Sequence, residues 1–215
     1  MLFSFCTLFA VSGFSQSKGY WSSGGEMLFS FADITDQGVN EGSTLRWAPI
    51  INLQGRYNYD LSESIGIFTG LGLHNVGYIY DKYQERTEEA LYYKKKFRTY
   101  NIGVPVGVKI GDLDDLFFYG GYEIEFPFVH KEKTIHNGDK IDSNVDWFSD
   151  RQEKFQHGFF AGVQFPYGFN VKFKYYLSEF HNQDYTESGG VKPYSGLESH
   201  IMYFSVGYNI SWDKE

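Results

Sequence analysis

Residues 100–110 read Tyr-Asn-Ile-Gly-Val-Pro-Val-Gly-Val-Lys-Ile, and this stretch decides the fold. Every second side chain is apolar or aromatic, and the positions between them hold small or polar residues and Lys109. Because successive side chains of a β-strand point to opposite faces, this spacing predicts an amphipathic strand. Pro105 lies on the face of small residues, where a bulge or kink can accommodate it.

The same alternation recurs along the chain. The predicted strands cover residues 26–32, 47–60, 65–80, 97–110, 116–129, 155–165, 168–180 and 199–213. Long polar connections (33–46, 81–97, 130–154 and 181–198) alternate with short turns (60–64, 111–115 and 166–168). This rhythm predicts an all-β fold, an eight-stranded antiparallel up-and-down transmembrane β-barrel with one elaborate and one plain end. Ten strands are the alternative if 81–97 or 130–154 forms another hairpin.

The composition fits such a barrel. Tyr, Phe and Gly number 18, 21 and 24 among 215 residues, which favours β structure. The mean hydropathy is only −0.39, as expected where lipid-facing apolar residues alternate with polar lumen residues. The net charge of −8 argues against a nucleic-acid partner, because phosphate binding needs clustered Lys and Arg.

Residues 1–15, MLFSFCTLFAVSGFS, predict a secretory signal peptide, although no basic region precedes the apolar stretch. Small residues at Gly13 and Ser15 place the cleavage before Gln16, which leaves 16–215 as the barrel domain. The only cysteine, Cys6, lies in the signal peptide, so the mature chain would contain no disulfide.

The polar faces of the predicted strands carry seven charged residues. They are Glu26, Arg56, Lys109, Glu123, Glu125, Lys172 and Lys174. A soluble lipocalin-like ligand carrier would turn these charges outward, whereas an outer-membrane barrel turns them into its lumen. Aromatic residues near the strand ends and the alternating connections favour the membrane barrel. Because eight strands enclose a space that side chains just fill, we interpret the charges as a structural ion-pair network in a plugged lumen. A proton or ion path is the functional alternative.

Histidines gather where the later strands meet the long connections. Strand parity predicts that His130, His157, His181 and His200 face lipid, whereas His74 points inward. The four rings either contact lipopolysaccharide phosphates or simply favour the interface, as amphipathic rings do. Their spacing matches no tight metal motif, so we expect neither a metal nor a cofactor.

An enzymatic alternative rests on Ser178, Glu179 and His181 at one strand end, with Ser199 and His200 on the partner strand. Outer-membrane lipid A deacylases and phospholipases use serine, histidine and an acid in this way. No nucleophile elbow or oxyanion-hole glycine cluster accompanies these residues. We therefore interpret the chain as non-enzymatic, without catalytic residues.

The last predicted strand ends in Ser205-x-Gly207-x-x-Ile210-x-Trp212. This pattern resembles the terminal signal that the barrel insertion machinery of the outer membrane reads, although three residues follow Trp212. Residues 100–109 are similar to a recurring strand of the PorT-like outer-membrane β-barrel family of Bacteroidetes, and the whole mature chain resembles small barrels of the OmpA and OmpX type in pattern. The resemblance implies an envelope or secretion partner and carries no active site.

These observations lead to one functional hypothesis. The chain is expected to be a small barrel of the cell outer membrane, in contact with membrane lipid and lipopolysaccharide. Its role would be non-enzymatic: surface exposure, adhesion, envelope integrity or the support of a secretion apparatus. The lipid-modifying enzyme and the soluble carrier remain the alternatives.

Overall fold

The computed structural model describes residues 19–85 and 91–212, and the predicted signal peptide lies outside them. The strands are β1 (Gly19–Asp36), β2 (Val39–Gly42), β3 (Arg46–Ala48), β4 (Leu53–Asp60), β5 (Ile65–Gln84), β6 (Tyr92–Gly111), β7 (Phe117–His136), β8 (Asp139–Trp147), β9 (Gln156–Gln164), β10 (Phe169–Tyr176) and β11 (Leu197–Trp212). A single turn of 3-10 helix, η1 (Pro166–Gly168), joins β9 to β10. Within the described ranges, no helix is long and apolar enough to cross a membrane.

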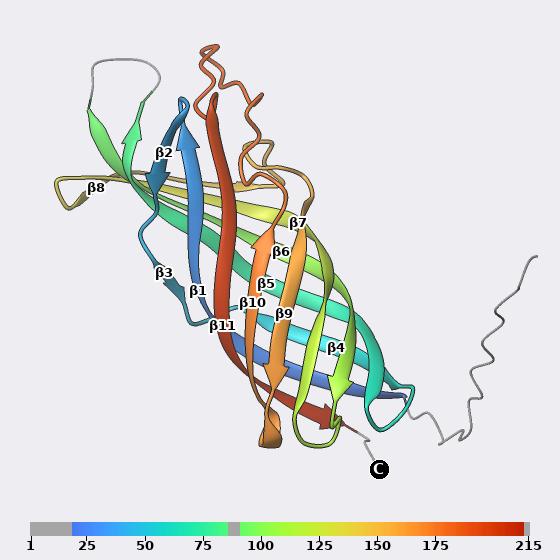
Figure 1. The fold of residues 1–215 in the computed structure, drawn as a ribbon. Helices are drawn as coiled ribbons and strands as arrows, with labels where there is room; N and C mark the ends of the chain where they lie inside the picture. The colour runs from blue at the N-terminus through green and yellow to red at the C-terminus, as the bar shows by residue number, and fades with distance from the viewer. Residues whose placement is uncertain (1–18, 86–90, 213–215) are drawn as a thin grey trace, which may run out of the picture.

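Eight of these strands close into a ring (Figure 1). The order around the ring is β1, β4, β5, β6, β7, β9, β10 and β11, all neighbours are antiparallel, and β11 pairs again with β1. The closing ladder runs from the pair Trp21 and Trp212 to the pair Asp36 and Leu197. Such closure removes the free edges that an open sheet exposes. The predicted eight-stranded up-and-down barrel is confirmed.

Three short strands lie beside the ring and do not enlarge it. β2 and β3 pair with β1 beyond the end of β4, and β8 pairs with β7. Residues 130–154 therefore do contain an additional hairpin strand. It projects from the wall of the barrel, as Figure 1 shows, and the ring keeps eight strands.

Several predicted strand ends are wrong, and the errors share one cause. The prediction of 26–32 covers only the middle of β1, and the predicted connections 33–46, 81–97 and 130–154 contain strand residues. β5, β6 and β7 each have 20 residues, about twice the ~9–11 that cross a bilayer. The hydrogen-bonded ladder continues beyond the membrane, where the apolar alternation that marks a strand in the sequence stops.

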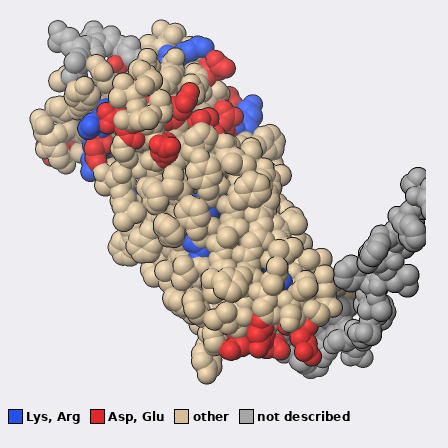
Figure 2. All heavy atoms as spheres, viewed as in Figure 1, with Lys and Arg blue, Asp and Glu red and all other residues tan. Residues whose placement is uncertain are grey.

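The apolar faces of the strands point outward. On β6, Ile102, Val106 and Ile110 are 46, 61 and 57% exposed, whereas Lys109 is 2% exposed. Figure 2 shows an almost uncharged waist between charged side chains at the end with the long loops and a smaller acidic group at the end with the short turns. We call these the loop end and the turn end. The soluble-carrier alternative is thus wrong, and the chain is a transmembrane β-barrel of the outer-membrane type.

A β-bulge in β7 changes which side chains face the lumen. Tyr100 of β6 pairs with Val129, but the next residue pairs with Pro127, so Phe128 is an extra residue. Such a bulge shifts the alternation by one position. Glu123 and Glu125 face inward below the bulge, and even-numbered residues face inward above it. The prediction that His130 faces lipid is therefore wrong.

Pro105 causes less disturbance than a bulge or kink. It lies in the ladder opposite Glu123 of β7. Towards β5 the ladder is interrupted between Thr69 and Gly72 and resumes in the same register, and the Thr69 hydroxyl donates a hydrogen bond to the Pro105 carbonyl at 2.9 Å. The missing proline N–H thus leaves the register of β5 and β6 unchanged.

Candidate functional site

The seven predicted charges all point into the barrel, where each is at most 8% exposed. Five of them form a central group, which we call the lumen network together with His74. Its members are Glu26 on β1, Glu123 and Glu125 on β7, Lys172 and Lys174 on β10, and His74 on β5. Arg56 and Lys109 lie nearer the turn end, so the structure divides the predicted set into two groups.

Ion pairs connect the lumen network. The Lys174 ammonium lies 2.7 Å from Glu123 and 2.5 Å from Glu125, and His74 Nε2 lies 3.0 Å from Glu123. Lys172 lies 2.7 Å from Glu26. Every charged member of the network therefore has an opposite charge in contact. This pairing matters because an unpaired charge buried from water costs several kcal/mol.

The Tyr176 hydroxyl and two polar side chains complete this group. Tyr176 and Asn101 donate hydrogen bonds to Glu125 at 2.8 and 2.6 Å, and Ser205 donates to Glu26 at 2.5 Å. Ser205 is one of the predicted insertion-signal residues. In the folded barrel its side chain points inward and contacts the lumen network. The bonds from Asn101 and Ser205 satisfy carboxylate oxygens that the ammonium groups do not reach, whereas Tyr176 shares one Glu125 oxygen with Lys174.

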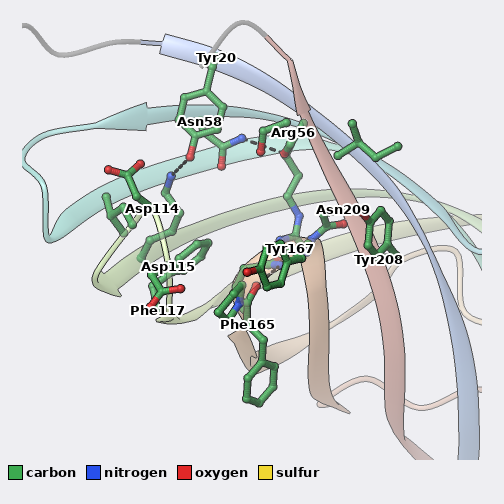
Figure 3. Close-up of a pocket in the computed structure, with 18 residues that line it drawn as sticks. Tyr20, Arg56, Asn58, Asp114, Asp115, Phe117, Phe165, Tyr167, Tyr208 and Asn209 are labelled. Atoms are coloured by element: carbon green, nitrogen blue, oxygen red, sulfur yellow. Dashed lines mark hydrogen bonds between the residues drawn. The ribbon is translucent and has the colours of Figure 1, made fainter. Parts of the chain in front are cut away.

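The lumen network fills the middle of the barrel. The free space left beside His74, Glu123 and Lys172 is about 10 Å³, which is at the limit of room for one water molecule. Towards the turn end the lumen opens into a vestibule of about 400 Å³, shown in Figure 3. The vestibule is a dead end, because the ion pairs separate it from the loop end.

Aromatic rings hold the two charges of the turn-end group. The Arg56 guanidinium lies 4.9 Å from the centre of the Phe68 ring and 5.1 Å from that of Tyr119. Lys109 donates a hydrogen bond to the Tyr20 hydroxyl at 2.9 Å and contacts Asp60 in an ion pair of 2.5 Å. Both cations line the vestibule and stay largely desolvated beside π-faces.

His74, Glu123 and Glu125 also offer three possible metal-ligand atoms within 4.8 Å of one another. Lys174 contacts both carboxylates of this trio. A metal ion there would have to displace the Lys174 ammonium from the two carboxylates. The two positive charges would then lie close together in a buried space. The donor set therefore does not fit a metal site.

The loop end is closed by a second group of side chains, which we call the cap. His181 shares a hydrogen bond of 2.8 Å with the Tyr78 hydroxyl, and its ring stacks on Tyr194 with 4.3 Å between centres. Tyr194 donates to Glu132 at 2.7 Å, and Lys95 contacts the same carboxylate at 2.6 Å. The segment between β10 and β11 is thus tied to β5, β6 and β7.

Burial and charge set the protonation of the cap. Burial opposes ionisation of Glu132, but the nearby His130 ring and the Lys95 ammonium hold the pKa of Glu132 below its usual range. Complete burial, together with the nearby His130 ring and Lys95 ammonium, holds the pKa of His181 well below its usual range. The cap therefore combines an ionised glutamate with a neutral histidine at neutral pH.

The predicted positions of the four rim histidines prove half right. His157 and His200 face outward, and they contact the Tyr122 hydroxyl at 2.6 Å and the Glu179 carboxylate at 3.0 Å. His130 and His181 are fully buried. His130 is turned inward by the bulge, and His181 lies beyond the end of β10, where strand parity no longer applies.

The serine and histidine residues of the enzymatic alternative do not pair with one another. The Ser178 hydroxyl accepts a hydrogen bond from the His157 backbone at 3.0 Å. Glu179 accepts one from the Ser199 backbone at 2.6 Å and contacts His200. Within the described ranges, no hydrogen bond joins a serine hydroxyl to a histidine ring among these residues. These residues therefore do not form the hydrogen-bonded serine and histidine pair on which the enzymatic alternative rests.

The predicted insertion signal lies on β11, the strand that closes the ring. Ser205 is buried, whereas Ile210 and Trp212 are 48 and 53% exposed on the outer face. Gly207 faces Asn170 inside the barrel, and Trp212 Nε1 donates to the Ser23 hydroxyl of β1 at 3.1 Å. The strand therefore presents one polar and one apolar face, as its sequence pattern predicts.

The cap is the feature that the sequence does not predict. Tyr78 and Phe97 continue the inward alternation of β5 and β6, and this continuation is the signal that could locate them. Tyr194 and His181 lie in an irregular segment, and their inward position depends on contacts distant in the chain.

Comparisons with known proteins yield similar folds alone. No family model and no curated protein matches the chain. Ail of Yersinia pestis is 13% identical, with 89% of this chain and 99% of that chain covered and a TM-score of 0.40. Neisserial surface protein A is 12% identical over 91 and 99% of the two chains, with a TM-score of 0.41. OprG of Pseudomonas aeruginosa is 11% identical, with 89% of this chain and 95% of that chain covered and a TM-score of 0.37.

Proposed function

We propose that the protein is a non-conducting, non-enzymatic barrel of the outer membrane that presents a rigid loop end to a partner in the envelope or at the cell surface. One observation carries this proposal: the lumen network fills the barrel, with about 10 Å³ of free space beside it. A solute path would need an open lumen, and an eight-stranded ring gives no room for one around paired side chains.

The loop end supports the presenting role. The cap anchors the segment between β10 and β11. Binding of a partner would therefore not cost the conformational entropy of ordering this segment. The β7–β8 hairpin projects from the ring, and in the part of the chain that the structure describes β8 pairs with β7 alone. Its second edge is free to receive a strand from a partner protein, a common mode of peptide recognition.

The resemblance of residues 100–109 to the PorT-like family of Bacteroidetes favours a secretion or envelope partner over an adhesive role. The protein then acts as a membrane anchor for that partner, with membrane lipid and lipopolysaccharide around its apolar waist.

Planar-bilayer recording tests the non-conducting role. The full mature chain is refolded, inserted and compared with a variant that lacks the central ion pairs (Lys174→Ala with Glu123→Ala and Glu125→Ala). Wild-type protein should give no conductance steps, and the variant should give small ones because its lumen is opened. Regular steps from wild-type protein, at a frequency matching its insertion, would contradict the proposal.

The lipid A profile tests the non-enzymatic role. A deletion strain is complemented with wild-type protein, with Ser178→Ala or with His181→Ala, and lipid A is analysed by mass spectrometry. We expect one profile for all four strains. A change on deletion that wild-type protein reverses, and that either variant does not, would establish the lipid-modifying alternative.

A further inference from the structure

The outward faces of β6 and β7 change from apolar to basic at the same height. Along β6 the outward residues run from Ile102 to Tyr100 and then to Arg98 and Lys96, and on β7 Lys131 and Lys133 follow the bulge. Four cations thus lie side by side immediately beyond the apolar waist. With Arg46 of β3, they form what we call the basic wall.

The cations of this wall face one another directly. Arg98 pairs with Lys131 in the ladder, and Lys96 pairs with Lys133. Like charges directly opposite on one face destabilise a sheet. Burial and the surrounding cations, Lys131 first among them, hold the pKa of Lys133 below its usual range. The pairs therefore cost stability unless an anion lies between them.

Among the residues that the structure describes, carboxylates do not supply that anion. In the described parts of the chain, none forms an ion pair with a member of the basic wall, and Asp81 on the same side contacts Lys94 at 2.8 Å. On β8, Val145 and Ser143 lie opposite Lys131 and Lys133, so the wall continues without an acidic residue at these positions.

A hollow of about 130 Å³ lies between the cations, which is room for a group larger than a single water molecule. Its lining comprises Arg46, Trp47, Ile79, Lys96, Phe97, Arg98, Lys131 and Lys133. The Arg46 guanidinium is positioned by a hydrogen bond of 3.1 Å to the Asn75 carbonyl. Guanidinium and ammonium groups that converge in this way suit the oxygens of a phosphate group.

We propose that the basic wall binds the phosphate groups of a phosphorylated lipid headgroup in the leaflet around the loop end. The position favours a lipid over a soluble anion, because the four lysine and arginine residues of β6 and β7 that line the hollow lie on the outer face of the barrel, just beyond the apolar waist. Tyr100 and the 61% exposed Trp47 flank it, and such aromatic residues mark the membrane interface. The acyl chains would then lie along Ile102 and Val104, below the phosphates.

Lipid binding to the refolded full mature chain in detergent tests this inference. Bisphosphorylated lipid A and the same lipid after enzymatic dephosphorylation are the probes, read by native mass spectrometry and by thermal unfolding. The test variant is Arg98→Gln with Lys131→Gln. The control is Lys82→Gln with Lys192→Gln, which removes the same charge from two cations that are paired with Glu41 and Asp184.

We expect bisphosphorylated lipid A to bind and stabilise wild-type and control proteins. It should bind the test variant at least about tenfold more weakly, since each of the two substitutions removes charged hydrogen bonds to phosphate. Without lipid the test variant should unfold at the same temperature as wild type or a higher one, because the repulsion is gone. A purely structural role of the two cations would instead lower its unfolding temperature in both conditions.

Three results would overturn the proposal. Equal binding of phosphorylated and dephosphorylated lipid would mean that acyl chains alone are recognised. Equal stabilisation by millimolar inorganic phosphate would mean a site for a free anion. Binding of heparin in place of lipid A, lost in the same variant, would mean that the wall takes a sulfated glycan.

Discussion

Lys174 on β10 lies 2.7 Å from Glu123 on β7, and the same ammonium reaches Glu125 at 2.5 Å. The two strands are not neighbours, since β9 lies between them. One lysine therefore forms ion pairs with two carboxylates that face the lumen from the same strand. This arrangement makes the pairing of Glu123 and Glu125 depend mainly on a single lysine.

Replacement of Lys174 by Met should destabilise the barrel strongly. The substitution leaves two buried carboxylates with His74 and hydrogen-bond donors alone, and breaking a buried ion pair costs about 3–5 kcal/mol. Urea unfolding of the protein in lipid vesicles measures the loss. The control is Lys192→Met, whose exposed partner Asp184 lies at 3.2 Å and whose loss should cost less than about 1 kcal/mol.

A second variant separates charge from packing. Lys174→Met combined with Glu123→Gln and Glu125→Gln removes the unpaired charges but not the change of shape. It should recover much of the lost unfolding free energy. If the triple variant is no more stable than Lys174→Met alone, packing rather than charge accounts for the effect.

Substitution of Gly121 by Ala should destabilise the barrel through contact between backbones. An added Cβ would lie 2.1 Å from the Val106 carbonyl and 2.6 Å from Gly107 Cα, so β6 and β7 would have to move apart. Overpacking of this kind costs about 1–3 kcal/mol. Gly55→Ala is the matched control, because a Cβ there meets nothing within 4 Å.

The two glycine variants should differ in sign. Alanine restricts the unfolded chain more than glycine does, so Gly55→Ala should stabilise by about 0.5–1 kcal/mol. Unfolding midpoints of both proteins, taken in the same detergent, make the comparison. Similar destabilisation at both positions would show that the close approach of β6 and β7 at Gly121 is not limiting.

The alternation within the membrane makes the ring predictable from the sequence. On β6 the apolar positions from Ile102 to Ile110 face lipid and Lys109 faces the lumen. The polarity of each side chain therefore predicts whether it faces lipid or lumen. Strand ends are not predictable in this way. Above Tyr100 both faces of β6 are polar or aromatic, and the hydrogen-bonded ladder continues without a chemical signal.

The candidate sites divide along the same line. Glu123 and Lys174 are recognisable as lumen residues because regular strands carry them, although their contact depends on the ring order. His130 and His181 are not recognisable. One extra residue, Phe128, reverses the side on which His130 lies, and His181 takes its position from packing on Tyr194. In neither case does the local sequence contain a pattern from which strand alternation could predict the side on which the histidine lies.

Acidification from pH 7 to about pH 5 should loosen the cap. Burial holds the pKa of His181 well below its usual range, so the closed cap keeps this ring neutral. When the cap opens, the ring recovers a pKa near 6.5 and takes up a proton as the pH falls below that value. The opening free energy should therefore fall by up to roughly 1.4 kcal/mol per pH unit below 6.5.

Hydrogen exchange of the segment between β10 and β11, corrected for the intrinsic pH dependence, measures this opening. Glu132 should not contribute in this range, because its lowered pKa matters only below the ordinary glutamate value near 4.3. In His181→Gln the corrected opening free energy should become independent of pH between 7 and 5. A pH dependence unchanged by that substitution would assign the effect to another group, with His130 the first to test.

Replacement of Trp212 by Ala should impair insertion in cells more than it impairs stability. Trp212 lies at the exposed end of β11, and its hydrogen bond to Ser23 is exposed, so the loss of unfolding free energy should be about 1 kcal/mol. Heat-modifiability of outer-membrane fractions reports insertion, and urea unfolding of refolded protein reports stability.

The matched control is Trp21→Ala, because Trp21 lies opposite Trp212 in the closing ladder and is similarly exposed, at 57%. Both variants lose one interfacial indole, yet only Trp212 belongs to the terminal pattern. If Trp212 acts as an insertion signal, its variant accumulates outside the outer membrane while the Trp21 variant inserts normally. Equal insertion defects in the two variants would reduce the role of Trp212 to that of an interfacial aromatic residue.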